Sequence, residues 1–292
     1  MVEPTGLPKP TGPTPPPKAP VAPVASLKID AKAEMARLTA NYLDNKAKKV
    51  NFLIVGYKGS GKTHILKTMP QPIHIDSFDP GGSLTLIDEI EEGKVVPDRR
   101  WEAENDKQPW AFKAWDDEFL RRLRGGYFDH IGTYVLDSLS LWSDALMNYI
   151  TSEDSRAGTA PWQSDYGLQQ IMAKTAVKMI GGLPCYTVIT AHLDTMKDEI
   201  TGAIVTSLLF PGKGSTKIPL PIDEMYVLET KEVPVAGKGM QLQRNLITQP
   251  TGKYRACTRM GRNGLFALRE EADLGRLIKK AGFPFEHKPL FK

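Results

Sequence analysis

The sequence predicts an α/β fold, in which a mostly parallel sheet is flanked by helices and extended by antiparallel strands toward the C-terminus. Short apolar runs that are typical of buried strands alternate with longer segments of helical spacing, which indicates parallel βαβ units. Shorter β-prone stretches, at residues 225–229 and 243–248, then follow without that alternation. With 292 residues, the chain is long enough for one large domain and an appendage.

The elements of this domain follow from the apolar pattern along the chain. We expect strands at residues 50–55, 73–76, 133–136 and 185–190. We expect helices at residues 30–46, 61–69, 83–92, 116–124, 141–151, 168–180 and 270–281. Pro70 and Pro72 end the second of these helices, because proline cannot continue a helix. Residues 93–109 are polar and irregular, so we expect a surface excursion there.

The N-terminal segment differs from the rest in composition. Nine of the 23 prolines fall within residues 1–26, and such a stretch cannot bury enough apolar surface to offset its ordering entropy. We therefore expect a disordered tail there, with a docking segment for a protein partner as the alternative. Residues 27–48 are expected to form an N-terminal helix and linker, and residues 49–292 the α/β domain.

Composition and charge limit the class of protein. Hydrophobic residues make up 41% of the chain and charged residues 25%, and a net charge of +4 does not by itself predict a nucleic-acid surface. Two cysteines, Cys185 and Cys257, are too few for a disulfide framework or a zinc site. No apolar run reaches the length of a membrane span, and no signal-peptide pattern is present. We expect a cytoplasmic protein that does not bind membranes.

A complete G-x-x-x-x-G-K-[ST] pattern stands between the first strand and the next helix. Its glycines let the backbone turn so that successive N–H groups point at phosphate oxygens, and the helix start adds further unpaired N–H groups. The lysine supplies a charge for the β- and γ-phosphates, and the threonine hydroxyl can ligate Mg²⁺. The pattern predicts an ATP-binding loop, with a glycine-rich turn without ligand as the alternative. Its residues are Gly56, Tyr57, Lys58, Gly59, Ser60, Gly61, Lys62 and Thr63.

Such a loop needs a second carboxylate that holds Mg²⁺ at the end of a buried strand. Asp137 ends the apolar run 134–136 and fits this requirement. We therefore expect Thr63 and Asp137 to bind the metal. The alternative for Asp137 is an ordinary helix N-cap, because aspartate caps helices readily and a helix follows shortly after.

Hydrolysis also needs a group that orients or deprotonates the attacking water, in addition to Lys62. Asp79 is the first candidate and Asp76 the second, since both lie at the end of the second strand and sheet topology can bring that end beside the phosphates. The alternative is a turn, because Asp-Pro-Gly-Gly is strong turn chemistry. His192, after the fourth strand, can sense the γ-phosphate or be a structural histidine.

With these motifs in place, the chain resembles the RecA/Rad51-like ATPases, and among them the compact phage group of AAA-type nucleotide-binding proteins. Some members of that group act as single-strand annealing or recombination factors. The resemblance covers residues 49–264 and implies a RecA-like P-loop domain that binds ATP and Mg²⁺. The motifs that carry it are residues 56–63, 75–82, 135–140 and 188–192.

The same resemblance implies a DNA-binding face. In RecA-like proteins, the loops after the metal strand's helix and after the sensor strand face DNA, and the matching segments here are residues 152–167 and 193–217. Trp162 and Tyr166 could stack on bases, and Lys213 and Lys217 could contact phosphates. Acidic residues also lie in both segments, so mobile surface loops remain the alternative.

The leading hypothesis is a Mg²⁺-dependent ATPase that acts on single-stranded DNA in phage recombination or replication. A homo-oligomer is compatible with this hypothesis. A second hypothesis, from another class, is a slow or non-hydrolysing nucleotide-gated regulator that binds a protein partner through its proline-rich tail. A kinase of small molecules is a third. Stimulation of ATP hydrolysis by single-stranded DNA separates the first hypothesis from the second.

Overall fold

A computed structural model describes residues 30–46, 49–197, 202, 204–235, 237 and 239–291. The chain divides into two compact units, residues 1–43 and 44–292. The expected N-terminal helix is present as α1 (Ala31–Lys46), whose charged and exposed side chains include the ion pair between Arg37 and Glu34 at 2.6 Å. The predicted tail, residues 1–26, lies outside the described residues.

The second unit is built on a sheet of nine strands among the described residues, in the order β3-β2-β4-β5-β1-β7-β8-β9, with β6 paired to β5. Neighbours from β3 to β7 are parallel, and β8 and β9 are antiparallel. The predicted fold class, a mostly parallel sheet with an antiparallel C-terminal extension, is therefore confirmed. The strands are β1 (Asn51–Gly56), β2 (Ile73–Ser77), β3 (Val95–Asp98), β4 (Thr133–Asp137), β5 (Tyr186–Lys197), β6 (Ile204–Leu208), β7 (Glu224–Val235), β8 (Gly239–Ile247) and β9 (Arg269–Glu271).

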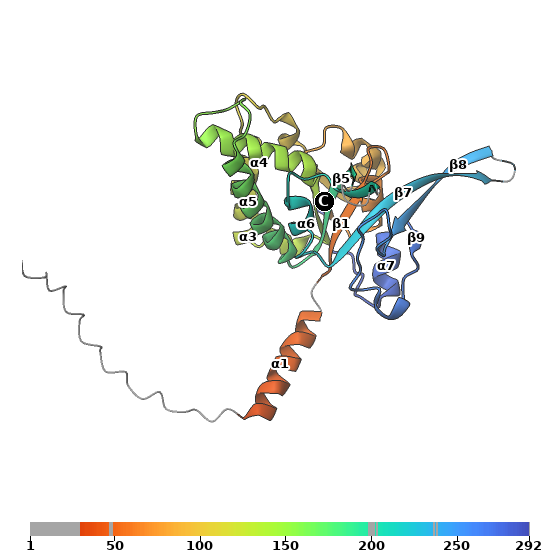
Figure 1. The fold of residues 1–292 in the computed structure, drawn as a ribbon. Coiled ribbons are helices and arrows are strands. Elements are labelled where there is room, and N and C mark those ends of the chain that lie inside the picture. The colour runs from red at the N-terminus through yellow and green to blue at the C-terminus, as the bar shows by residue number, and fades with distance from the viewer. Residues whose placement is uncertain are drawn as a thin grey trace, which may run out of the picture. The chain divides into compact units, whose positions relative to one another are not determined.

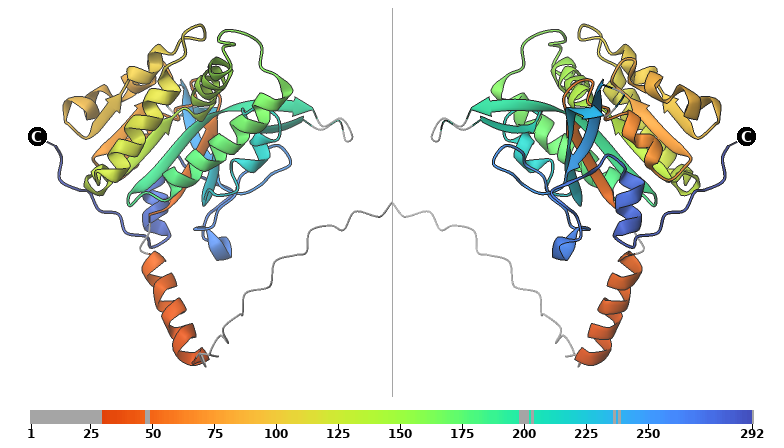
Figure 2. Two further views of the ribbon diagram at one scale, coloured as in Figure 1. Left: turned by 90° about the vertical axis from the view of Figure 1, so that its left-hand side faces the viewer. Right: turned by 90° about the vertical axis from the view of Figure 1, so that its right-hand side faces the viewer.

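Helices cover both faces of this sheet, as the views in Figure 2 show. The α-helices of the second unit are α2 (Ile87–Glu91), α3 (Ala111–Arg124), α4 (Leu139–Glu153), α5 (Gln163–Gly181), α6 (Gly214–Lys217) and α7 (Leu274–Lys280). The short 3-10 helices are η1 (His64–Thr68), η2 (Gly82–Leu86), η3 (Arg100–Ala103), η4 (Tyr127–His130) and η5 (Arg262–Gly264). None of the described helices is long and apolar enough to cross a membrane.

The central strands are buried on both faces because their side chains alternate between two cores. In β1, Leu53 and Val55 pack with the apolar side chains of α3, α4 and α5. Phe52 and Ile54 point to the opposite face, where they pack with η1 and α7. The continuous apolar run of β1 thus fills both cores at once, which is what a central parallel strand requires.

Strands β7 and β8 form a long hairpin that projects from the sheet (Figure 1). Its ladder runs from the pair Val227–Ile247 at the base to Val235–Gly239 near the turn. The expected strands at 225–229 and 243–248 are only the basal part of this hairpin. The outer part carries exposed polar and apolar side chains on both strands, so no buried face marks it in the sequence.

Two elements of the structure differ from those that the sequence predicts, one directly after the phosphate loop and one at the edge of the sheet. The expected helix 61–69 is shorter, a 3-10 helix at His64–Thr68, because it starts later: Gly61 has a φ of 99°, which lies outside the helical region. The expected surface excursion 93–109 contains the edge strand β3, parallel to β2. Pro97 lies within β3, a position that proline tolerates because an edge strand leaves one row of N–H groups unpaired.

The two segments expected to be loops are largely regular. Helix α5 begins at Gln163, which places Tyr166 in its first turn, so the first loop is shorter than residues 152–167. Strand β5 runs on to Lys197 and pairs antiparallel with β6, from Leu193–Leu208 to Lys197–Ile204. Among the described residues of the second segment, 193–197 and 204–208 therefore form two paired strands, and the single turn α6 follows.

Candidate functional site

Three parallel strands, β1, β2 and β4, end at one edge of the sheet, and the fourth, β5, passes it before it pairs with β6. Gly56, the last residue of β1, is level with His192 in β5, and Ser77, the last residue of β2, is level with Asp137 in β4. His192 was expected after the strand, and it lies within it. Because the carboxyl ends of parallel strands share an edge, residues far apart in the chain converge beside the phosphate loop.

The phosphate loop connects β1 to η1 in a tight turn. Gly59 and Gly61 have φ angles of 78° and 99°, in the left-handed region that glycine adopts without strain. The Lys62 ammonium donates to the carbonyl oxygens of Gly56 at 3.0 Å and Tyr57 at 3.1 Å. These bonds close the loop around its own lysine.

Two features of the loop fit a ligand with oxygen atoms. The Ser60 hydroxyl is buried and has no hydrogen-bond partner among the described residues. A methyl group on Gly56 would lie 2.5 Å from that hydroxyl oxygen, so only glycine fits there. An unpaired buried hydroxyl is costly unless a ligand or water completes it.

Thr63 and Asp137, the two residues predicted to bind the metal, are in direct contact. The Thr63 hydroxyl donates to Asp137 Oδ2 at 2.8 Å, and the Thr190 hydroxyl donates to Asp137 Oδ1. Asp137 makes no cap for α4, which starts at Leu139 without a side-chain capping bond. Burial raises the pKa of Asp137, against the opposing effect of these two hydroxyl groups.

The surroundings of this pair suit Mg²⁺. A methyl group added to Gly82 would lie 3.4 Å from both Asp137 Oδ2 and Thr63 Oγ1, so the glycine keeps the two oxygens uncovered. A hydroxyl and one carboxylate, completed by water and phosphate oxygens, form the kind of ligand set that Mg²⁺ takes in nucleotide sites. Within the described part of the chain, no three His, Cys, Asp or Glu side chains gather into a metal cluster.

Asp79 and Lys62 lie on either side of His192. The ring nitrogen Nε2 of His192 is 3.5 Å from Asp79 Oδ2, and Nδ1 is 3.4 Å from the Lys62 ammonium. A neutral imidazole with its proton on Nε2 satisfies both contacts. The contact with His192 holds the pKa of Asp79 below its ordinary value despite partial burial. Burial lowers the pKa of Lys62, although Asp137 and Asp79 oppose that shift.

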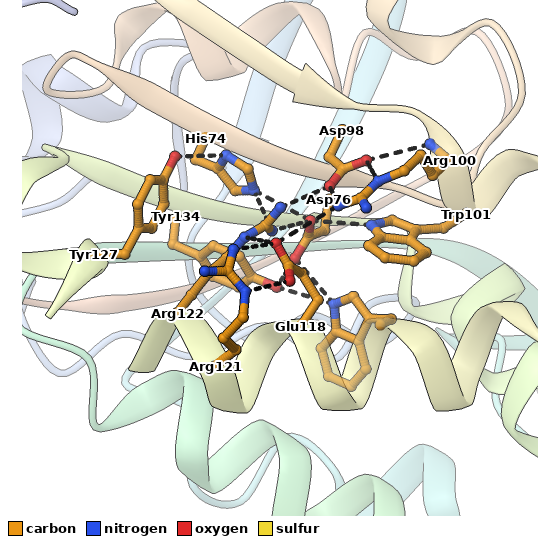
Figure 3. Close-up of polar contacts among 11 residues, drawn as sticks. His74, Asp76, Asp98, Arg100, Trp101, Glu118, Arg121, Arg122, Tyr127 and Tyr134 are labelled. Carbon is orange, nitrogen blue, oxygen red and sulfur yellow. Dashed lines mark hydrogen bonds and ion pairs between the residues drawn. The ribbon is translucent and has the colours of Figure 1, made fainter. Parts of the chain in front are cut away.

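Asp76, the second predicted catalytic carboxylate, lies in a different place. It is completely buried and accepts hydrogen bonds from the indoles of Trp101 at 3.1 Å and Trp115 at 3.0 Å. The Tyr134 hydroxyl at 2.7 Å, the guanidinium of Arg122 at 2.9 Å and Nε2 of His74 at 3.1 Å complete its surroundings (Figure 3). Donors therefore surround both oxygens, and Asp76 does not line the cavity of the phosphate loop. This enclosure favours a structural role for Asp76 over the catalytic role that the sequence predicted.

Arg122 is the centre of this buried network. Its guanidinium contacts three carboxylates, Asp76 at 2.9 Å, Asp98 at 2.7 Å and Glu118 at 3.1 Å. These residues come from β2, β3 and α3, which the ion pairs thereby hold together (Figure 3). The network fixes the end of β2, from which the chain continues to Asp79.

A cavity of about 400 Å³ lies beside the phosphate loop. It is lined by the phosphate loop, by the turn that follows β2, by His192 and by Arg244 of β8. Sequence reasoning missed Arg244, because it lies almost two hundred residues after the loop in a segment without any motif. It also missed Thr190, because this residue lies within a buried strand whose sequence gives no sign of a contact with Asp137.

The residues predicted to contact DNA do not line this cavity, and they differ in their exposure and in their contacts. Trp162 is 61% exposed, and the guanidinium of Arg156 covers one face of its ring at 3.7 Å from the centroid. Arg156 also pairs with Asp154 at 3.0 Å and Asp165 at 2.9 Å, so its charge is already balanced. Lys213, just before α6, is exposed.

Comparison with known proteins gives a family and a weak structural likeness. A family model described as an AAA domain matches residues 48–260. No curated protein matches the sequence. Among solved structures, the crystal structure of the RadB recombinase is similar with a TM-score of 0.36 and 9% sequence identity, over 68% of this chain and 87% of that one.

Proposed function

Because the chain belongs to the AAA domain family, whose model spans residues 48–260, we propose that it binds ATP with Mg²⁺ in the cavity of the phosphate loop and hydrolyses it. The family supports a nucleotide-binding ATPase. The observation that carries the finer proposal is the convergence of Lys62, Thr63 and Asp79 on one cavity, from segments far apart in the chain. Asp137 lies buried behind the cavity wall, where it accepts the hydrogen bond of the Thr63 hydroxyl.

Each of these groups has a distinct task in the proposal. The Lys62 ammonium exchanges a carbonyl partner for a phosphate oxygen, which is a charge-assisted contact. The Ser60 hydroxyl gains a partner, and the loop N–H groups surround the phosphates. Thr63 and Asp137 hold Mg²⁺, which neutralises charge on the phosphate oxygens when it is bound.

Asp79 orients the attacking water in this proposal. The contact with His192 lowers its pKa, which favours the ionised carboxylate, and that carboxylate can accept a hydrogen bond from the attacking water. His192 positions Asp79 through Nε2 and contacts Lys62 through Nδ1. If a change at the phosphates moves Lys62, His192 transmits this movement to Asp79, because it contacts both side chains. This is the behaviour expected of a histidine that senses the γ-phosphate.

We further propose that single-stranded DNA is the partner that ATP binding controls, in phage recombination or replication. Support comes from the resemblance to the phage ATPase group and from exposed Trp162 and Lys213, in the two segments that face DNA in RecA-like proteins. The alternative is a slowly hydrolysing regulator that binds a protein partner.

The experiment that tests this function measures steady-state ATP hydrolysis with Mg²⁺, with and without a single-stranded oligonucleotide. The proposal expects hydrolysis that the oligonucleotide stimulates and that Lys62→Ala abolishes. ATP binding without stimulation would favour the regulatory alternative. The absence of both binding and hydrolysis would contradict the proposed function altogether.

A further inference from the structure

Arg244, on β8, reaches the phosphate loop from the antiparallel hairpin of the same chain. Its Nε donates to the Ser60 carbonyl oxygen at 3.1 Å. Directly opposite Arg244 in the ladder is Thr230 of β7, whose hydroxyl contacts the same carbonyl oxygen at 3.4 Å. Both strands of the hairpin thus hold one peptide group of the loop.

The side chain of Arg244 lies flat against the loop and extends into the cavity. A methyl group on Gly61 would lie 2.8 Å from Nε and 3.0 Å from Cδ of Arg244, so glycine is what permits this close approach. Arg244 lines the cavity with Lys62 and Thr63. None of the ion pairs formed between described residues engages its guanidinium, in contrast to Arg269 on the adjacent strand, which pairs with Glu229 at 2.9 Å.

The balance of charge in the cavity makes this arginine relevant to a ligand. Asp79 and Asp137 both act on the charge of Lys62, and the cationic side chains that line the cavity besides Lys62 are Lys58 and Arg244. A triphosphate with Mg²⁺ keeps a net negative charge, so Arg244 is one of the few side chains that can balance it. A guanidinium whose Nε is bound to the loop still has two NH₂ groups available, and guanidinium groups bind phosphate oxygens in a planar, bidentate manner.

We infer that Arg244 is a phosphate ligand supplied by the chain's own β7–β8 hairpin, and that it couples nucleotide binding to that hairpin. The inference rests on the proposed function, because it requires the nucleotide phosphates to occupy the cavity of the phosphate loop. Once Arg244 binds a phosphate, the nucleotide, the loop and β8 form one connected unit. The bound nucleotide therefore stiffens the base of the hairpin.

The test measures affinity for a non-hydrolysable ATP analogue with Mg²⁺ by titration calorimetry in the full-length protein. Arg244→Gln should weaken binding by about 10-fold to 100-fold, as expected for the loss of hydrogen bonds to a charged group. Arg244→Lys keeps the charge and should lose less. Arg269→Gln, the matched control on β9, should bind like the wild type. Circular dichroism melting shows whether each variant is folded.

Hydrogen exchange supplies the second measurement. The analogue should protect amides of β8 in the wild type and in Arg269→Gln, and should not protect them in Arg244→Gln. The inference is overturned if Arg244→Gln binds as tightly as the wild type while Lys62→Ala does not. The inference would also be overturned if Arg244→Gln and Arg244→Lys lost the same affinity and the analogue still protected β8 in both variants. Arg244 would then act only through its hydrogen bond to the Ser60 carbonyl oxygen and not as a phosphate ligand. Failure of the wild type to bind would instead defeat the proposed function itself.

Discussion

Asp79, which follows β2, and Asp137, at the end of the neighbouring strand β4, both lie near the loop lysine, yet their surroundings shift their pKa values in opposite directions. Burial raises the pKa of Asp137, whereas the contact with His192 lowers the pKa of Asp79. A bound cation would reverse the first shift, because it favours the ionised carboxylate. Two carboxylates with divergent pKa values are typical of sites in which each has its own task.

Replacing Asp79 should separate ATP binding from hydrolysis. Asp79→Asn keeps the shape of the side chain but loses the charge that orients the attacking water, so turnover should fall by about 10²-fold or more while ATP affinity is retained. Steady-state turnover and calorimetric affinity check the two parts. Asp88→Asn, on the exposed surface of α2, is the control. Unchanged turnover in Asp79→Asn would remove Asp79 from the mechanism.

Asp76 should instead govern stability. Asp76→Asn breaks the buried pair with Arg122, so the free energy of unfolding at pH 7 should fall by about 3–5 kcal/mol. Asp117→Asn, which loses an exposed pair with Lys113 on α3, should change it little. Urea unfolding of both variants measures the difference. A wild-type-like Asp76→Asn would contradict the structural role.

The stabilisation by Asp76 should also depend on pH. Burial alone would raise its pKa, but His74, Arg122 and the Tyr134 hydroxyl hold the pKa of Asp76 well below its ordinary value. The unfolded chain therefore binds the proton first as the pH falls below about 4, and the stabilisation is full above that value and declines below it. The difference in the free energy of unfolding between the wild type and Asp76→Asn should accordingly decrease from pH 7 to about pH 3.

At the scale of elements, the sequence predicts the buried strands well and the exposed ones poorly. Strand β1 is an unbroken apolar run because it fills two cores, and that run is visible without a structure. Strand β3 contains Pro97 and only one buried residue, Val95, so its pattern resembles a loop. The outer half of β8 has only exposed side chains, and no pattern distinguishes it from a polar connection.

The segment before α5 should be the element that contacts DNA bases. Trp162 is exposed at the start of this helix, and loss of one stacked base costs about 1–3 kcal/mol, so Trp162→Ala should weaken single-strand binding roughly tenfold or more. Fluorescence anisotropy with a labelled oligonucleotide and an ATP analogue measures the affinity. Phe291→Ala, an exposed aromatic near the C-terminus, is the control.

Lys213 distinguishes phosphate contact from stacking in the same assay. Lys213→Gln should reduce the slope of affinity against salt concentration by about 0.7 units for single strands, whereas Trp162→Ala should leave the slope unchanged. If neither variant alters binding, these two segments are not the DNA contact. If the wild type has no affinity for single strands in the presence of the analogue, the regulatory alternative takes precedence.

At the scale of the whole molecule, the N-terminal tail should be dispensable for folding. Nine prolines within residues 1–26 leave little apolar surface to bury, so deletion of this segment should change neither the melting temperature nor ATP affinity. Differential scanning calorimetry and nucleotide titration test both points. A large drop in melting temperature would show that the tail packs on the domain.

The assembled site combines local motifs with contacts that only the fold creates. The phosphate loop is continuous in sequence, so residues 56–63 could be identified before the structure. Asp137 could be identified too, because it ends an apolar strand. The separation of Asp79 from Asp76 could not, since the two lie only three residues apart at the end of β2, and only packing shows that Asp76 is enclosed by donors. Arg244 depends on the pairing of β7 with β8 and on Gly61, which no local pattern reveals.

The central claim, that this cavity binds ATP through the phosphate loop, is tested most directly by calorimetric titration of Mg²⁺ and a non-hydrolysable ATP analogue. The wild type should bind, and Lys62→Ala should bind more weakly by about 1.5–3 kcal/mol through the loss of a charge-assisted contact. Lys67→Ala, whose ammonium faces Glu89 at 3.7 Å outside the cavity, should match the wild type. Equal affinity in the wild type and Lys62→Ala, or no binding by the wild type, would contradict the claim.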